Sequence, residues 1–194
     1  MRIHLALGRK ALDAGDAAAA RRHFEEALES PLNLGESKHL LANQSDIYYW
    51  LGCACEAVGD DASRRIAREA WTAAAAFRGD FQERAVRAFS EMTYFSALSL
   101  GKLGRKAEAR ELFRSLKAYA KQLFKTEAKV YYFATSLPAR LLFDNLQRRQ
   151  ETTALLIEAQ ACLGLGDKTS ARRLLNTVIE RDPARALAKD LLGE

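Results

Sequence analysis

Four segments of the chain share one spacing of small, flexible and bulky residues. Each has a glycine with a small residue seven positions before it, and an alanine after it that is followed four positions later by a bulky apolar residue. The first copy consists of Gly8, Gly15, Ala20 and Phe24. The other copies are Gly52, Gly59, Ala67 and Trp71; Ala97, Gly104, Ala109 and Phe113; and Ala159, Gly166, Ala171 and Leu175. Such recurrence indicates a protein built from repeated structural units that stack on their neighbours.

The pattern predicts pairs of antiparallel helices. Gly8 and Ala20 suit the place where two helices approach most closely, because a large side chain there would push them apart. Gly15 suits the left-handed residue that ends the first helix, and Pro31 ends the second. We expect Phe24 to fill the space between neighbouring pairs. In the second copy the alanine follows the glycine by eight residues instead of five, which predicts a second helix nearly one turn longer.

The composition favours helices over a sheet. The chain has 35 Ala and 28 Leu, which are strong helix formers, but only nine Val and Ile together, which favour strands. With three prolines, helices can run long. We predict helices at about residues 2–14, 17–30, 45–58, 61–77, 81–103, 105–124, 127–134, 138–148, 150–165, 168–181 and 184–192.

The four copies resemble the tetratricopeptide repeat (TPR). This resemblance implies an all-α fold in a single TPR-like domain, 1–194, in which antiparallel helix hairpins form a right-handed superhelix (an α-solenoid). The steps between the turn glycines are 44, 45 and 62 residues, longer than the TPR period of about 34. The implied repeats lie at about 1–34, 45–78, 90–123 and 151–184, with a degenerate unit at 124–150 and a capping helix at 184–192.

The segments around the repeats have a closer resemblance. SPLNLGESKH, DIYYWLG, SEMTYFSALSLGKLGR and YYFATSLPARLLFDNLQRR resemble the C-terminal TPR region of large bacterial proteins whose N-terminal, carbohydrate-related domain has no known function. The resemblance implies a helical repeat region, not a catalytic centre. It leaves open an accessory C-terminal region of a carbohydrate-active enzyme. A self-assembling scaffold is a further alternative, and so is a homo-oligomer, since uncapped solenoid ends pair with other copies.

TPR arrays bind peptides in a concave groove lined by the first helix of each hairpin. Residues at the matching positions are Arg9, Asp46, Tyr49, Cys53, Glu56, Glu91, Tyr94 and Leu98. Tyrosines and carboxylates there would offer apolar contact and hydrogen bonds to an extended or helical peptide. Packing between helices is the alternative for Tyr49 and Tyr94, and it is the favoured interpretation for Trp50 and Phe95.

The remaining chemistry points away from an enzyme. The histidines, His4, His23 and His39, have no partner at a metal-binding helix spacing, and three cysteines do not suggest a disulfide framework. The net charge of +5 is spread along the chain, unlike the basic face of a nucleic-acid-binding protein. No apolar run approaches the roughly 20 residues that span a bilayer. We therefore expect a cytoplasmic, non-catalytic protein that binds a protein or peptide, with no cofactor, metal, nucleic acid or membrane.

Overall fold

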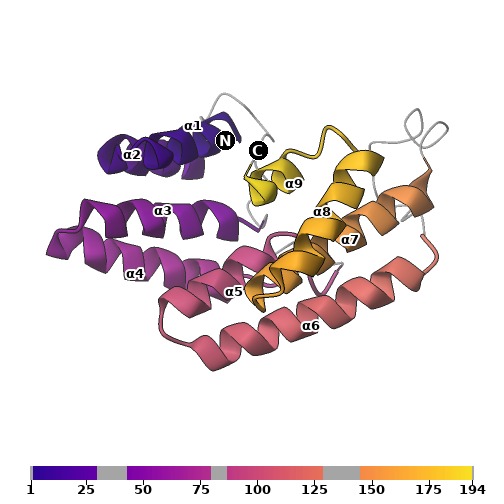
Figure 1. Cartoon of the computed structure of the whole chain (residues 1–194). Coiled ribbons are helices and arrows are strands. Elements are labelled where there is room, and N and C mark those ends of the chain that lie inside the picture. The colour runs from indigo at the N-terminus through magenta and orange to yellow at the C-terminus, as the bar shows by residue number, and fades with distance from the viewer. Residues whose placement is uncertain (1, 30–42, 80–86, 129–144, 194) are drawn as a thin grey trace. The chain divides into compact units, whose positions relative to one another are not determined.

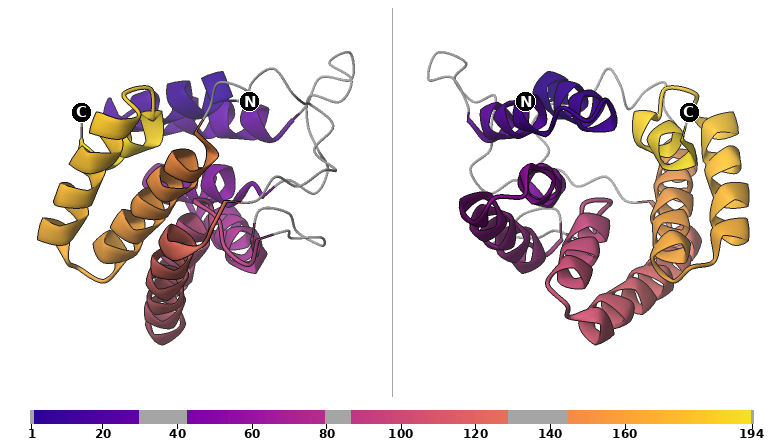
Figure 2. Two further views of the ribbon diagram at one scale, coloured as in Figure 1. Left: turned by 90° about the vertical axis from the view of Figure 1, so that its right-hand side faces the viewer. Right: turned by 60° about the vertical axis from the view of Figure 1, so that its left-hand side comes forward.

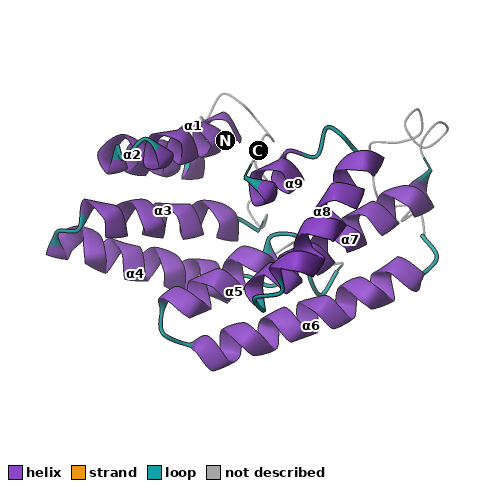
Figure 3. Cartoon of the chain, in the orientation of Figure 1, coloured by secondary structure: helices purple, strands orange, loops and turns teal. Residues whose placement is uncertain are grey.

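The structure, a computed structural model, describes residues 2–29, 43–79, 87–128 and 145–193. In these ranges every regular element is an α-helix and no strand occurs (Figures 1 and 3), which confirms the all-α prediction. The helices are α1 (Arg2–Asp13), α2 (Ala17–Leu28), α3 (Ser45–Val58), α4 (Asp61–Ala76), α5 (Thr93–Lys102), α6 (Lys106–Lys125), α7 (Leu146–Gly164), α8 (Lys168–Arg181) and α9 (Ala186–Leu192).

The chain divides into two compact units, unit 1 (Met1–Arg110) and unit 2 (Glu111–Glu194). In unit 1, α1 pairs with α2 and α3 pairs with α4, as the views of Figure 2 also show. Helix α2 packs against α3, α4 packs against α5, and the first helices are neighbours in order, α1 with α3 and α3 with α5. In unit 2, α7 pairs with α8, and α9 packs against α8. A single domain over the whole chain stays a prediction.

Tight turns on left-handed glycines join the helices of each pair. The N–H of Gly15 donates to the Leu12 carbonyl at 3.0 Å, and the next N–H, of Asp16, donates to the Ala11 carbonyl at 2.9 Å. Glycine ends helices in this way because other residues rarely adopt a positive φ. All four predicted turn glycines have it: Gly15 (81°), Gly59 (83°), Gly104 (80°) and Gly166 (86°). The prediction that these glycines end helices is confirmed.

An aspartate after three of these glycines begins the next helix. Asp16 Oδ1 accepts a hydrogen bond from the Ala19 N–H at 2.9 Å, and Asp60 Oδ1 accepts one from the Ser63 N–H at 2.8 Å. Asp167 does the same at the start of α8. Each bond satisfies a backbone donor that has no partner within its helix. A Gly-Asp dipeptide thus ends one helix and starts another.

The small residues seven positions before the turn glycines are buried, as predicted. A Cβ atom added to Gly8 would lie 2.6 Å from the Phe24 ring, and one added to Gly52 would overlap the Trp71 indole. Since carbon atoms need about 3.5 Å, only glycine lets these rings lie so close to α1 and α3. The four buried small residues are Gly8, Gly52, Ala97 and Ala159.

The rings also connect one pair to the next. Phe24 and Trp71 belong to one core of unit 1. Phe24 therefore packs between neighbouring helix pairs, as predicted, and it also packs against Gly8 of its own pair. That core consists of Ala20, Phe24, Leu51, Ala54, Cys55, Ala67, Ala70 and Trp71. In unit 2 the corresponding core consists of Leu156, Ala159, Leu175, Val178 and Ala188.

The helix predicted over residues 81–103 starts late. It begins at Thr93, and residues 87–92 are not helical; residues 80–86 lie outside the described ranges. Thr93 Oγ1 accepts from the Ser90 N–H at 3.0 Å, and Ser90 Oγ accepts from the Met92 N–H at 3.2 Å. Short polar side chains that bind nearby backbone in this way compete with helix formation, so this prediction was wrong over 87–92.

The predicted break between helices 138–148 and 150–165 is also wrong. Helix α7 is continuous and starts after Asn145, whose Oδ1 accepts a hydrogen bond at 2.9 Å from a backbone N–H of the first turn. Of the helix predicted at 127–134, the first two residues are not helical. The rest of it, and the helix start predicted at Pro138, lie outside the described residues.

Candidate functional site

The predicted groove residues all lie in unit 1. On α3 they recur every three or four positions and therefore share one side of that helix. Arg9 lies on α1; Asp46, Tyr49, Cys53 and Glu56 lie on α3; Glu91 precedes α5; and Tyr94 and Leu98 lie on α5. Because α1 neighbours α3 and α3 neighbours α5, contacts join side chains from all three helices.

Aromatic rings of α3 and α5 form a continuous cluster. The Tyr49 ring centroid lies 5.2 Å from that of Trp50, at an interplanar angle of 71°, and 5.8 Å from that of Phe95. Phe95 in turn contacts Tyr94, with centroids 5.4 Å apart. Tyr49 and Trp50 are half-buried, whereas Tyr94 is 8% exposed and Phe95 is 5% exposed. The two rings on α3 are therefore partly accessible to solvent, and the two rings on α5 pack beneath them in the interior.

Burial keeps the hydroxyls and the thiol of this cluster protonated. It raises the pKa of Tyr94 to about 12. Burial is also the largest cause that raises the pKa of Tyr49 above its ordinary value, followed by the neighbouring Cys53. The pKa of the Cys53 thiol is raised by burial as well. The two phenols are thus neutral hydrogen-bonding groups at neutral pH, and the thiol lacks the lowered pKa of an activated nucleophile.

Two cations lie over the tryptophan rings of this region. The Arg9 guanidinium carbon is 5.2 Å from the Trp50 ring centroid, and the Lys102 Nζ is 5.1 Å from that of Trp71. Such cation–π contacts contribute about 0.5–1 kcal/mol at exposed sites. They connect α1 with α3 and α5 with α4, and they place positive charge over the half-buried Trp50 ring and the buried Trp71 ring.

Glu56 on α3 forms an ion pair with Lys102 on α5. The Glu56 side chain is 51% exposed and that of Lys102 is 35% exposed. Exposed pairs of this kind add little to stability. We call Arg9, Tyr49, Trp50, Glu56, Tyr94, Phe95 and Lys102 together the first-helix face.

Three further predicted residues are Asp46, Glu91 and Leu98. Asp46 Oδ1 accepts a hydrogen bond from the Ile47 N–H at 2.9 Å in the first turn of α3, where a negative charge is favourable. Glu91 and Leu98 are half-buried.

Lys102 is a member of the face that sequence reasoning missed. Its partners Glu56 and Trp71 lie 46 and 31 positions away, so no local spacing points to them. A signal existed nevertheless, because Lys102 lies four positions after Leu98 and eight after Tyr94. Extending the helical spacing by one turn would have included it.

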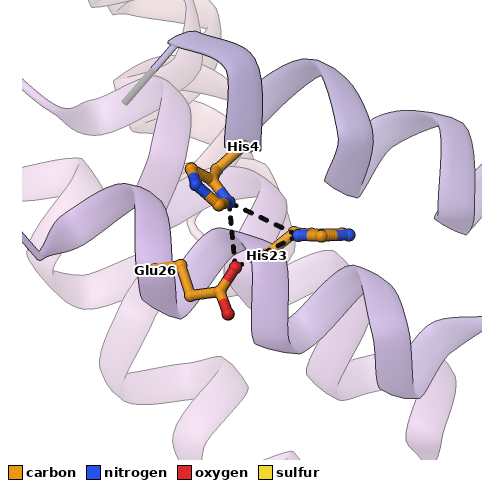
Figure 4. A group of neighbouring side chains, drawn as sticks. All are labelled: His4, His23 and Glu26. Carbon is orange, nitrogen blue, oxygen red and sulfur yellow. Dashed lines mark hydrogen bonds and ion pairs between the residues drawn. The ribbon is translucent and has the colours of Figure 1, made fainter.

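A second cluster missed at the sequence level joins α1 and α2 (Figure 4). Nδ1 of His4 lies 2.9 Å from Oε2 of Glu26, and Nδ1 of His23 lies 3.2 Å from the same oxygen. The two Nδ1 atoms are 3.5 Å apart. His23 and Glu26 are three residues apart on α2, and the antiparallel contact of Gly8 with Phe24 brings the start of α1 beside them. Only that pairing register, and no motif, would have revealed the cluster.

No family model matches the chain. Among the described residues, no helix combines the length and the apolar character needed to cross a membrane.

Proposed function

We propose that unit 1 is a non-catalytic peptide-binding module, built as a TPR-like array whose first helices line the binding surface. The observation that carries this proposal is the half-buried Tyr49–Trp50 pair, which has Arg9 over one ring and the exposed Glu56–Lys102 ion pair nearby. The right-handed superhelix expected from the TPR resemblance is part of the proposal. It is supported by the repeated turn glycines and by the order in which α1, α3 and α5 neighbour one another.

The first-helix face suits a peptide that combines an apolar side chain with hydrogen-bond acceptors. Aromatic residues with a polar end, such as Tyr49 and Trp50, bury apolar area and still form a directed hydrogen bond. The rings are held by their contacts with Phe95 and Arg9, so a partner would meet a preformed surface and lose little affinity to ordering it. Arg9 and Lys102 favour an acidic group beside the apolar side chain.

The test uses peptides selected from a random displayed library on the wild-type protein. The Kd of a selected peptide is measured by fluorescence anisotropy. The double variant Tyr49→Ala with Tyr94→Ala is expected to weaken binding by more than about tenfold, because truncating a central interface residue costs roughly 2 kcal/mol or more. Circular dichroism checks that the variant keeps its helix content.

Two further variants separate lost contacts from altered packing. Since Tyr94 is buried, the double variant Tyr49→Phe with Tyr94→Phe removes only the hydroxyls, each worth about 0.5–1.5 kcal/mol. Tyr48→Phe is the matched control, because the Tyr48 ring lies 6.0 Å from Phe77 and not in the cluster. The proposal fails if no peptide is selected, if the alanine variant binds as the wild type does, or if Tyr48→Phe weakens binding equally.

A further inference from the structure

The first helix pair carries three metal-ligand side chains at one point. His4 of α1 and His23 and Glu26 of α2 point toward one another, as Figure 4 shows. The backbone that carries them is fixed nearby, because Gly8 lies directly against the buried Phe24 ring. The side chains themselves reach solvent, with exposures of 39% for His4, 22% for His23 and 42% for Glu26. The cluster is therefore both positioned by the fold and accessible to an ion.

The distances among the three ligand atoms match a tetrahedral zinc site. The His4 Nδ1, His23 Nδ1 and Glu26 Oε2 atoms form a triangle with sides of 2.9, 3.2 and 3.5 Å. Zinc bonds to imidazole nitrogen and carboxylate oxygen are about 2.0–2.2 Å long. Two ligands at a tetrahedral angle are then about 3.3–3.5 Å apart. Only shifts of a few tenths of an ångström would seat an ion above this triangle, and water would occupy the fourth position.

The chemistry of the donors selects the type of ion. Two imidazoles with one carboxylate form a mixed nitrogen and oxygen set, which suits Zn²⁺ and not the all-oxygen preference of Ca²⁺ or Mg²⁺. In the absence of an ion, at least one imidazole must carry a proton on Nδ1 to donate to Glu26 Oε2. Zinc takes the place of that proton on Nδ1, and the neutral imidazole then carries its proton on Nε2 instead.

We propose that His4, His23 and Glu26 bind a zinc ion and that the ion holds the start of α1 to the end of α2. This site is separate from the first-helix face, because none of its three residues belongs to that face. Bound zinc stabilises the folded state by RT ln(1 + c/Kd), where c is the free zinc concentration, and this stabilisation grows as c rises above the Kd. The melting temperature of the wild-type protein should therefore rise with added zinc.

The experiment measures Zn²⁺ binding to untagged protein by competition with a fluorescent chelator at neutral pH. One ion per chain is expected. His4→Ala and His23→Ala should each weaken binding by more than about tenfold, since losing even a hydrogen-bond partner of a metal ligand costs 10–100-fold. Glu26→Gln should weaken it as well. The rise in melting temperature with zinc should disappear in the same variants.

Three controls make the result specific to this site. Glu25→Gln changes the neighbouring carboxylate, which binds Arg21 at 2.8 Å instead, and it should leave zinc affinity unchanged. His39→Ala tests the remaining histidine and should do the same. The absorption spectrum of bound Co²⁺ should show tetrahedral coordination without a thiolate band, which excludes the cysteines. The proposal is overturned if wild-type protein binds no stoichiometric zinc, or if the His4→Ala and His23→Ala variants bind it unchanged.

Discussion

The first and second helix pairs of unit 1 place a glycine at the same position but pack different rings against it. In the first pair, Phe24 lies nine residues after the turn glycine and covers Gly8. In the second pair, Trp71 lies twelve residues after its turn glycine and covers Gly52. The three extra residues lengthen the second helix by about 4.5 Å at a rise of 1.5 Å per residue.

The two rings also differ in hydrogen bonding. Trp71 contacts Gly52 with its pyrrole edge, and its Nε1–H donates a hydrogen bond to the Tyr49 carbonyl at 3.2 Å. Phe24 has no group that donates a hydrogen bond. In both pairs the small residue lies seven positions before the turn glycine, whereas the bulky residue differs both in its distance along the chain from the turn and in the kind of ring.

The largest expected effect comes from removing the rings. Trp71→Ala and Phe24→Ala should each lower the free energy of unfolding by about 3–5 kcal/mol. The loss should be greater for Trp71→Ala, because it also removes the hydrogen bond to Tyr49 and the contact with Lys102. Urea denaturation followed by circular dichroism measures both. A larger loss of unfolding free energy in Phe24→Ala would show that the hydrogen bond and the Lys102 contact of Trp71 do not make the second pair more dependent on its ring.

Filling the glycine position is expected to have the next largest effect. Gly52→Leu should destabilise the protein by about 1–3 kcal/mol through overpacking, because even a Cβ atom there overlaps the Trp71 indole. Gly101→Ala is the matched control, since a Cβ at this position in α5 meets nothing within 4 Å. That change should stabilise the helix by up to about 1 kcal/mol. Equal stabilities of the two variants would contradict the close approach of α3 and α4.

The sequence predicted the repeated features of this fold well. A glycine at the end of a helix and an aspartate after it form hydrogen bonds with residues only a few positions away. The roles of Gly15 and Asp16 can therefore be predicted from the neighbouring sequence. The small residues facing large rings were also predictable, since they recur at fixed distances from the turns. These features located the turns between α1 and α2, α3 and α4, α5 and α6, and α7 and α8 without any information on long-range contacts.

The features that were missed depend on contacts between distant residues or on local competition. His4 meets His23 and Glu26 only through the pairing register of α1 and α2, and Lys102 meets Glu56 only through the packing of α5 on α3. The late start of α5 has a local cause, the hydrogen bonds of Ser90 and Thr93. Helix propensity averaged over a window does not contain that information.

The smallest expected effect distinguishes the turns of the two pairs. Asp60 accepts hydrogen bonds from both the backbone N–H and the hydroxyl of Ser63, each at 2.8 Å, whereas the equivalent partner of Asp16 is Ala19, which has no hydroxyl. The bonds from Ser63 lower the pKa of Asp60 below its ordinary value of 3.8. Since the folded pKa is the lower one, the stabilisation is complete above the unfolded pKa and is lost as the pH falls through the folded pKa.

Asp60→Ala should therefore lower the melting temperature at neutral pH, and its difference from the wild type should shrink in acid below pH 3.8. Asp60→Asn keeps an acceptor for the helix start but cannot ionise, so it should lose less at neutral pH. Asp61→Asn is the matched control, because that side chain is 99% exposed. Melting curves between neutral pH and about pH 3 measure all three. A melting-temperature difference for Asp60→Ala that stays constant over this range would show that the charge of Asp60 does not stabilise α4, and that only its hydrogen-bonding geometry does.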